Sequence, residues 1–401
     1  MLSDVYFPRV NGVSTSIRTF ARTLAAQGHR VTLVAPDYGS DSGQDAHDGD
    51  FEVIRLPSRK IFFDPEDRLI DRAALRDVLP RLSTRRWDAI HIHTPFRAHA
   101  LGVKLARRSG RPTVETYHTY FEEYVAHYLP WLPPPLLRWA ARAASRHLCH
   151  GVDHLIAPST QMVDVLRRYG IETPVTVAGT GLLLDEFAGG DGARFRARHG
   201  IGDRPTLVTV SRLAVEKNIA FLLRMAKRLV ADFPDLLLLI AGEGPDAPRL
   251  QALAVELGLQ DNVRFFGNLD RRTELLDCYR AGDVFVFASP TETQGLVLIE
   301  AMALGVPIVS TAVMGTAAVL RDASSAVVSA EDVDAFAAHV AELLRSPQRR
   351  ADLSAAGPRD AQAWSAEALM QPVIELYARL AARAGVAGAG GVAAVSVSVN
   401  G

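Results

Sequence analysis

The sequence predicts an α/β protein built from two Rossmann-like, doubly wound domains, and three observations support this prediction. The chain has 401 residues, which is more than a single hydrophobic core usually organises. Apolar residues make up 48% of it and charged residues 22%, the balance of a globular protein able to bury large cores. Short apolar runs alternate with amphipathic helical patterns in both halves, and this alternation is typical of parallel sheets with helical crossovers.

Eleven apolar runs are expected to be the strands of two sheets. In the first half these runs are residues 31–35, 89–92, 113–116, 154–157 and 175–178. In the second half they are residues 206–210, 236–241, 263–266, 284–288, 307–310 and 326–328. Helical patterns alternate with these runs, and the first of them, which precedes residues 31–35, carries Ile17, Phe20 and Leu24 on one face. This helix is predicted to start near Gly12 and to stop at Gly28.

The domain boundaries follow from this alternation of predicted strands and helices. The first domain is expected to cover residues 1–178 and the second residues 179–365, with the glycine-rich stretch 179–192 as the hinge. A closing helix is expected at residues 366–384. Residues 385–401 consist mostly of glycine, alanine, valine and serine, which predicts a disordered tail.

The first strand of the first domain is expected to be short or missing. Only residues 1–6 precede Pro8 and the turn at Asn11 and Gly12, whereas such a unit normally opens with a buried strand of about five or six residues. We therefore expect the natural start to lie upstream of Met1 and to supply a short aliphatic run. The alternative is that residues 392–399 fill the gap as a strand.

Composition also narrows the cellular setting. The longest strongly apolar run, residues 236–241, is far shorter than the roughly 20 residues that a membrane-spanning helix needs, so no membrane span is expected. Residues 1–9 lack the layout of a signal peptide, and Cys149 and Cys278 are the two cysteines of the chain. These features predict a cytoplasmic protein.

The charge distribution bears on partners. The formal net charge is −1, which favours no polyanion, and no nucleic acid partner is expected. Residues 1–175 carry 23 Lys and Arg against 19 Asp and Glu, so this half is the better candidate for contact with an anionic surface. The alternative is that so small an excess has no function.

The most informative stretch is residues 289–303, which read SPTETQGLVLIEAMA and follow the strand at 284–288. The loop runs through Gly295 into a helix, so backbone N–H groups and the helix dipole point to the crevice where ligands bind in such sheets. An anion is therefore expected there. Glu292 and Glu300 are spaced to hold different parts of one extended ligand, a sugar and a ribose, although either alone could be a surface acid.

A second cluster follows the first strand of the second half. Arg212 and Lys217 are expected at the same edge of the sheet, where two cations could neutralise a leaving diphosphate as a metal ion would. Taken alone, each would more often be a solvated surface charge. The two clusters on adjacent loops of one sheet favour a nucleotide diphosphate site.

These motifs together resemble glycosyltransferase family 4, the retaining nucleotide-sugar transferases of the GT-B fold. The resemblance spans roughly residues 4–380 and implies two facing Rossmann-like domains with a C-terminal helix that returns to the first. It implies a UDP- or GDP-sugar as donor, no cofactor and no metal. It assigns catalytic roles to His118 and Glu292. Its donor-binding residues would be Gly12, Arg212, Lys217, Thr293, Gln294, Gly295, Leu296, Val297 and Glu300.

A narrower resemblance concerns the branch of the family. Gln294 stands where phenylalanine is frequent, and residues 93–96, 117–119 and 122–124 are similar to those of diacylglycerol glucosyltransferases and GDP-mannose-dependent mannosyltransferases. This implies a lipid or glycan acceptor. Two other functions stay open from the residues alone, a nucleotide-sugar epimerase of the same architecture and an inactive sugar-binding homologue.

Two other patterns suggest different sites. Residues 242–247 imitate the dinucleotide fingerprint G-x-G-x-x-A, but they follow the second strand of their unit instead of the first. His91, His93 and His99 suggest a metal site, but no carboxylate cluster accompanies them, and a structural or substrate-lining role is favoured.

The N-terminal domain is also a candidate for peripheral membrane contact. Residues 131–146 combine tryptophan and leucine with Arg138, Arg142 and Arg146, the composition of an interfacial helix that binds anionic headgroups. The inner face of the cell membrane would be its site. The same residues would also suit a helix packed against the sheet.

Overall fold

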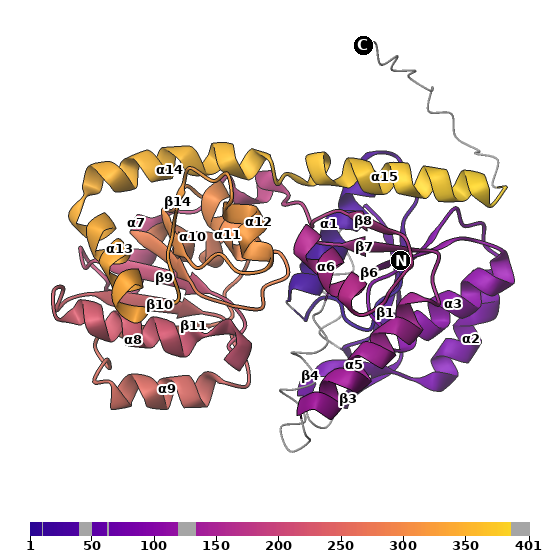
Figure 1. Cartoon of the computed structure of the whole chain (residues 1–401), viewed down its shortest axis with the longest axis horizontal. Helices are drawn as coiled ribbons and strands as arrows, with labels where there is room; N and C mark the ends of the chain where they lie inside the picture. The colour runs from indigo at the N-terminus through magenta and orange to yellow at the C-terminus, as the bar shows by residue number, and fades with distance from the viewer. Residues whose placement is uncertain (10, 40–49, 62–63, 119–133, 386–401) are drawn as a thin grey trace, which may run out of the picture.

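The computed structural model describes residues 1–9, 11–39, 50–61, 64–118 and 134–385. Figure 1 shows two α/β lobes side by side, with the long helices α14 (Pro347–Gln362) and α15 (Ala366–Arg383) running along one side of both. The two Rossmann-like halves predicted from the sequence are therefore confirmed. All eleven predicted strands are present, with ends within one residue of those expected.

The C-terminal lobe contains a six-stranded sheet in which every paired strand runs parallel, in the order β11-β10-β9-β12-β13-β14. The strands are β9 (Thr206–Val210), β10 (Leu237–Ala241), β11 (Val263–Gly267), β12 (Val284–Phe287), β13 (Ile308–Ser310) and β14 (Ala326–Val328). The strand order reverses between β9 and β12, and in doubly wound sheets ligands bind at the carboxyl ends of strands beside such a point. Both sequence clusters follow these two strands.

Helices cover both faces of this sheet. They are α7 (Gly192–Arg198), α8 (Ile219–Val230), α9 (Ala247–Glu256), α10 (Glu274–Ala281), α11 (Leu296–Ala303), α12 (Gly315–Leu320) and α13 (Val333–Arg345), with α14 beside them. Strands β9, β10 and β12 are fully buried and almost wholly apolar, as expected where helices pack on both sides of a parallel sheet.

The N-terminal lobe is less regular. Its strands are β1 (Thr32–Pro36), β2 (Glu52–Leu56), β5 (Ile90–Ile92), β6 (Thr113–Thr116), β7 (His154–Ala157) and β8 (Val175–Val177), and β3 (Ser58–Ile61) pairs with β4 (Asp64–Ile70) as an antiparallel hairpin. Its helices are α1 (Gly12–Ala26), α2 (Arg72–Ser83), α3 (Arg97–Ser109), α5 (Pro134–Cys149) and α6 (Thr160–Arg168). Strands β2, β3 and β4 were not predicted.

Strands β1 and β2 pair in parallel, and β5, β6, β7 and β8 form a second parallel group in that order. A single residue joins these two groups. Leu2 bridges Val34 of β1 and Ile92 of β5 in parallel register, with backbone bonds from Leu2 N–H to the carbonyl of His91 (2.8 Å) and from His93 N–H to the carbonyl of Leu2 (2.9 Å). The short first strand therefore occupies the central position. The alternative occupant, residues 392–399, lies outside the described residues, as does the expected tail beyond Gly385.

Helix α15 returns to the N-terminal lobe, as the resemblance implied. Its buried side chains Met370, Val373 and Leu376 pack against Phe20 and Leu24 of α1. Helix α1 itself starts and ends where the sequence predicted, because Asn11 caps its first turn and Gly28 follows with a φ of 84°.

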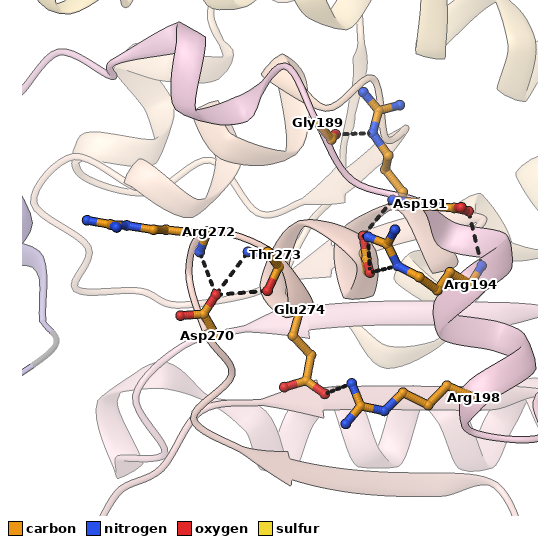
Figure 2. A network of polar contacts seen from close by, with 10 residues as sticks. Gly189, Asp191, Arg194, Arg198, Asp270, Arg272, Thr273 and Glu274 are labelled. Carbon is orange, nitrogen blue, oxygen red and sulfur yellow. Dashed lines mark hydrogen bonds and ion pairs between the residues drawn. The ribbon is translucent and has the colours of Figure 1, made fainter.

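The linker between the lobes is held more tightly than a free hinge of residues 179–192 would be. Figure 2 shows Asp191 and Arg194 bound to helix α10, where the buried carboxylate of Asp277 accepts from Asp191 N–H (2.6 Å) and from Arg194 Nε (2.8 Å). A Cβ atom at Gly192 would lie 2.2 Å from the carbonyl oxygen of Arg280. This part of the linker therefore belongs to the C-terminal lobe.

None of the helices that the structure describes combines the length and the apolar character required to cross a bilayer.

Candidate active site

A cleft of about 600 Å³ is lined by residues from both lobes. Every site residue selected from the sequence borders it. From the N-terminal lobe these are Gly12 and His118, and from the C-terminal lobe Arg212, Lys217, Glu292, Thr293, Gln294, Gly295, Leu296, Val297 and Glu300.

The loop from Ser289 to Gly295 forms one wall of the cleft. Gly295 has a φ of 84°, a left-handed conformation that favours glycine, and it is the N-cap of α11. Gly315 packs against this loop, since a Cβ atom there would lie 2.1 Å from the carbonyl oxygen of Thr293, and its N–H donates to the carbonyl of Glu292 (2.8 Å). The loop is thus held by backbone contacts that require a glycine opposite it.

Glu292 forms an ion pair with Lys217 at the end of the short helix η3 (Val215–Lys217). The distance from Lys217 Nζ to Glu292 Oε2 is 2.5 Å, and both side chains are about one-fifth exposed. The two sequence clusters, one after β9 and one after β12, therefore meet directly. Arg212 lines the same wall.

Glu300 is buried, and it has two partners that the sequence did not reveal. Arg271 Nη2 donates to Glu300 Oε1 (2.6 Å), and the hydroxyl of Tyr279 donates to Glu300 Oε2 (2.7 Å). Arg271 also lines the cleft. Its position after β11, at the carboxyl edge of the same sheet, was the one signal that could have found it. Tyr279 lies on α10 and carried no such signal.

The glycines of the apparent dinucleotide fingerprint have a packing role. A Cβ atom at Gly242 would lie 1.9 Å from the carbonyl oxygen of Ser211, and one at Gly244 would lie 2.2 Å from that of Leu213. The loop after β9 therefore crosses directly over the loop after β10. Leu213 N–H donates to the carbonyl of Glu243 (2.8 Å), which joins the two loops.

The N-terminal wall differs in character. Gly12 is the first residue of α1, and a Cβ atom there would meet no protein atom within 4 Å. His118 Nε2 lies 3.1 Å from His93 Nδ1, and burial lowers the pKa of His118 to about 4. This wall therefore offers a small backbone and a neutral imidazole.

His91 and His99, two of the histidines considered as metal ligands, have protein partners. His91 Nε2 shares a hydrogen bond with the hydroxyl of Thr116 (2.6 Å), and His91 Nδ1 with that of Tyr377 on α15 (2.6 Å). His99 Nδ1 lies 3.1 Å from the carboxylate of Glu115. Within the described residues, no group of three or more His, Cys, Asp or Glu side chains is arranged to hold a metal ion.

Gln294 borders the cleft, but its side chain is directed at the linker. Its Oε1 accepts from the N–H of Thr180 (2.6 Å), and its Nε2 donates to the carbonyl of Thr180 (2.6 Å). Because Thr180 occupies the side-chain amide, the backbone of Gln294 is the part that we expect to bind the donor.

Two family profiles match the chain. The one described as Glycosyltransferase Family 4 matches residues 10–186, and the one described as Glycosyl transferases group 1 matches residues 191–360. The chain is 33% identical over 319 residues to the alpha-monoglucosyldiacylglycerol synthase of Streptococcus pneumoniae, covering 77% of this chain and 70% of the relative. It is 31% identical over 315 residues to the GDP-mannose-dependent alpha-mannosyltransferase of Mycobacterium tuberculosis, covering 77% and 78%.

Solved structures show the same architecture. The Anabaena HepE protein in complex with UDP and glucose superimposes with a TM-score of 0.77 at 16% identity, covering 94% of this chain and 98% of that one. The sucrose-phosphate synthase of Thermosynechococcus elongatus gives a TM-score of 0.75 at 24% identity, covering 95% and 98%. At these identities the comparison concerns the fold, and it confirms the predicted GT-B architecture.

Proposed function

The chain belongs to glycosyltransferase family 4, and on this basis we propose that it is a retaining hexosyltransferase, which moves a sugar from a UDP- or GDP-linked donor to a lipid or glycan acceptor. One observation carries the proposal beyond family membership. The residues chosen from the sequence come from separate segments of both lobes, and they line one cleft. The names of these relatives, a monoglucosyldiacylglycerol synthase and a mannosyltransferase, do not favour an epimerase or an inactive homologue.

The C-terminal wall of the cleft suits a nucleotide diphosphate. Arg212 and Lys217 supply positive charge for the two phosphates, and Arg271 adds a third cation at the same wall. Glu300, fixed by two donors, would accept hydrogen bonds from the ribose hydroxyls. The backbone of Thr293, Gln294, Gly295, Leu296 and Val297 would complete the donor site, since it lies at the N-terminus of α11.

The sugar would lie between the lobes, where Gly12 allows close approach and His118 and Glu292 are within the same cleft. Glu292 would orient the sugar and stabilise the positive charge that develops on it. His118 is neutral at physiological pH because burial lowers its pKa, so it would exchange a hydrogen bond with a sugar hydroxyl without carrying charge.

Retention of configuration would follow from front-face attack. The bond between the anomeric carbon and the diphosphate oxygen breaks, the acceptor oxygen forms its bond from the same face, and the leaving phosphate takes the acceptor proton. Such a reaction depends on positioning and on stabilising the diphosphate charge more than on a strong side-chain base. Lys217 and Arg212 are the residues that would supply this stabilisation.

Peripheral membrane contact fits a lipid acceptor. In α5 the side chain of Trp139 is 63% exposed, and Arg142 on the same helix stacks over the ring of Tyr169 at 5.6 Å. The first part of the segment, residues 131–133, lies outside the described residues. Sedimentation with vesicles rich in anionic lipid tests this contact, which salt should release because surface electrostatics are screened. Absence of binding at low salt would indicate that α5 serves only to pack against the sheet.

A panel of radiolabelled nucleotide sugars tests the function. Transfer to a lipid or glycan acceptor, or slow hydrolysis, supports the proposal. Formation of an epimer would indicate an epimerase, and binding without turnover an inactive homologue. Thermal shift narrows the panel first, because a ligand at about 100 times its dissociation constant stabilises the folded state by about 2.7 kcal/mol.

A further inference from the structure

Thr180 lies where the chain leaves the N-terminal lobe, and three segments meet at it. Its peptide N–H and the carbonyl oxygen both bond the side-chain amide of Gln294, at 2.6 Å each. Its hydroxyl shares a hydrogen bond of 2.6 Å with the hydroxyl of Ser16. Gln294 belongs to the donor loop of the C-terminal lobe, whereas Ser16 belongs to the helix that begins at Gly12. Thr180 therefore connects the two walls of the cleft.

The connection is buried. Gln294, Thr180 and Ser16 are 5%, 6% and 1% exposed, so each polar group depends on its protein partner. A Cβ atom at Gly179 would lie 2.9 Å from Nε2 of Gln294, which explains why the amide can approach the backbone at this point. Removing the amide would leave a buried peptide group without its partner, a costly state.

The second crossing of the chain between the lobes lies beside the first. Leu182 N–H donates to the carbonyl of Trp364 (2.8 Å), and Ala366 N–H donates to the carbonyl of Leu182 (2.9 Å). A Cβ atom at Gly181 would lie 2.2 Å from Cα of Ala366. The two segments that cross between the lobes are therefore hydrogen-bonded to each other. Any movement of one lobe relative to the other must change the backbone conformation of the residues next to Thr180.

We propose that Gln294 is a positioning residue for sugar transfer, which acts through Thr180 and Ser16 to hold the donor loop in register with Gly12 of the opposite lobe. Its side chain sets where Glu292 lies relative to the N-terminal wall and does not itself contact the donor. This inference rests on the proposed function, because its main readout is transfer.

The variant Gln294→Leu separates positioning from donor binding. We expect kcat to fall about 100-fold, the scale of a misplacement of about 1 Å at a reacting pair. The dissociation constant of UDP or GDP should change less than about threefold, because the nucleotide contacts come from Glu300 and its neighbours in one lobe. Equal loss of nucleotide affinity and of turnover would indicate a direct donor contact and overturn the proposal. The matched control is Gln348→Leu on the exposed surface of α14, which should change neither quantity.

The variant Gln294→Glu provides a second test, which depends on the protonation state of the new carboxyl group, with the melting temperature at each pH as the control for folding. A carboxylate would accept from Thr180 N–H but would repel the carbonyl of Thr180, whereas the protonated acid could donate to it as the amide does. Burial beside a carbonyl raises the pKa of such a carboxyl group. The activity of this variant relative to the natural protein should therefore rise about fivefold or more from about pH 8 to about pH 5.5. A ratio that does not change with pH would contradict the proposed role.

The proposed function and the positioning role can fail separately. If the unaltered protein neither transfers nor hydrolyses sugar from any of the nucleotide donors, the proposed function is wrong. If the unaltered protein is active and Gln294→Leu turns over normally, only the positioning role is wrong.

Discussion

The two glutamates proposed to bind the donor lie in contrasting surroundings. At the buried end, Glu300 is 2% exposed and accepts from both Arg271 and Tyr279. At the open end, the side chain of Glu292 is 20% exposed, and its ion-pair partner is Lys217. Both glutamates lie on the segment from β12 into α11, yet one is fixed by two donors and the other is held by one flexible side chain.

This difference indicates a division of labour. A carboxylate held by two charge-assisted hydrogen bonds is preorganised, which suits a group that binds the same part of the ligand throughout the reaction. An ion pair with a lysine can exchange partners when a diphosphate enters, because the lysine side chain is flexible and its ammonium group binds phosphate as well as carboxylate. We therefore expect the buried end to serve affinity and the open end to serve turnover.

The largest effect should come from the open end. Glu292→Ala is expected to lower kcat about 1,000-fold, the range found when a group that stabilises transition-state charge is removed. The dissociation constant of the nucleotide should change less than about threefold. Glu292→Gln keeps the shape and loses the charge, so an intermediate kcat would assign the effect to charge. A variant with weakened nucleotide binding and normal kcat would reverse the assignment.

The buried end should show the opposite pattern. Glu300→Ala is expected to weaken nucleotide binding about 100-fold and leave kcat at saturating donor within about threefold, because the lost contact is the same in ground and transition states. The variant also leaves Arg271 buried without its partner, so its melting temperature must be measured alongside. Tyr279→Phe removes one hydrogen bond to Glu300 and should weaken binding about tenfold. A loss confined to kcat in both variants would refute the comparison.

The sequence predicted the residues at the open and the buried end of the proposed donor site to different extents, and the reason is physical. Glu292, Glu300, Arg212 and Lys217 follow strands β9 and β12, where the topology itself points to a ligand site. Tyr279 contacts Glu300 from an amphipathic helix, and an inward-facing tyrosine there looks like any core residue until the tertiary structure is known.

The same reasoning applies to the fold. Strands β9, β10, β12 and β13 of the C-terminal sheet are buried along their whole length and read as apolar runs, which is why their ends were predicted within one residue. Strands β2, β3 and β4 were missed because they contain charged residues, although β2 pairs in parallel with β1 and only β3 and β4 form a separate antiparallel hairpin. The central strand of the N-terminal sheet is a single bridge at Leu2, and its shortness was predicted from the few residues before Pro8, since one residue leaves no periodic pattern.

A test at Gly12 compares the two walls of the cleft. Gly12→Ala should leave the melting temperature unchanged or slightly higher, because the added methyl group meets no protein atom within 4 Å and alanine favours a helix by about 0.5–1 kcal/mol. Donor affinity should nevertheless fall about tenfold if the diphosphate approaches this backbone. Unchanged affinity in a folded variant would show that the donor stays away from the N-terminal wall.

The pH profile should be flatter than a histidine in the cleft suggests. Burial lowers the pKa of His118 to about 4, so this side chain is already neutral at about pH 6 and stays so as the pH rises. The value of kcat/KM should vary less than about twofold between about pH 6 and about pH 8 through this group, and an acid-side loss should appear only as the pH approaches about 4. An acid limb near pH 6.5 that disappears in His118→Asn would show that the imidazole is protonated in the working range.

The smallest expected effect is that of a chelator, and it concerns the cations of the C-terminal wall. Arg212, Lys217 and Arg271 line the cleft where the diphosphate is expected, and three positive charges can offset the charge that grows on a departing diphosphate. To do so, Lys217 would have to loosen its ion pair with Glu292. The ammonium group of Lys217 would then bind the phosphate while the carboxylate of Glu292 is left to interact with the sugar. Activity measured in excess EDTA should therefore match activity in added magnesium or manganese within about twofold. Loss of turnover in EDTA that either ion restores would mean that a metal supplies the positive charge, and the role assigned to Lys217 would then be wrong.

The variant Lys217→Gln tests the same role directly. Its kcat should drop by about 100-fold, because one of the charges that stabilise the departing diphosphate is lost, and added magnesium should not restore it.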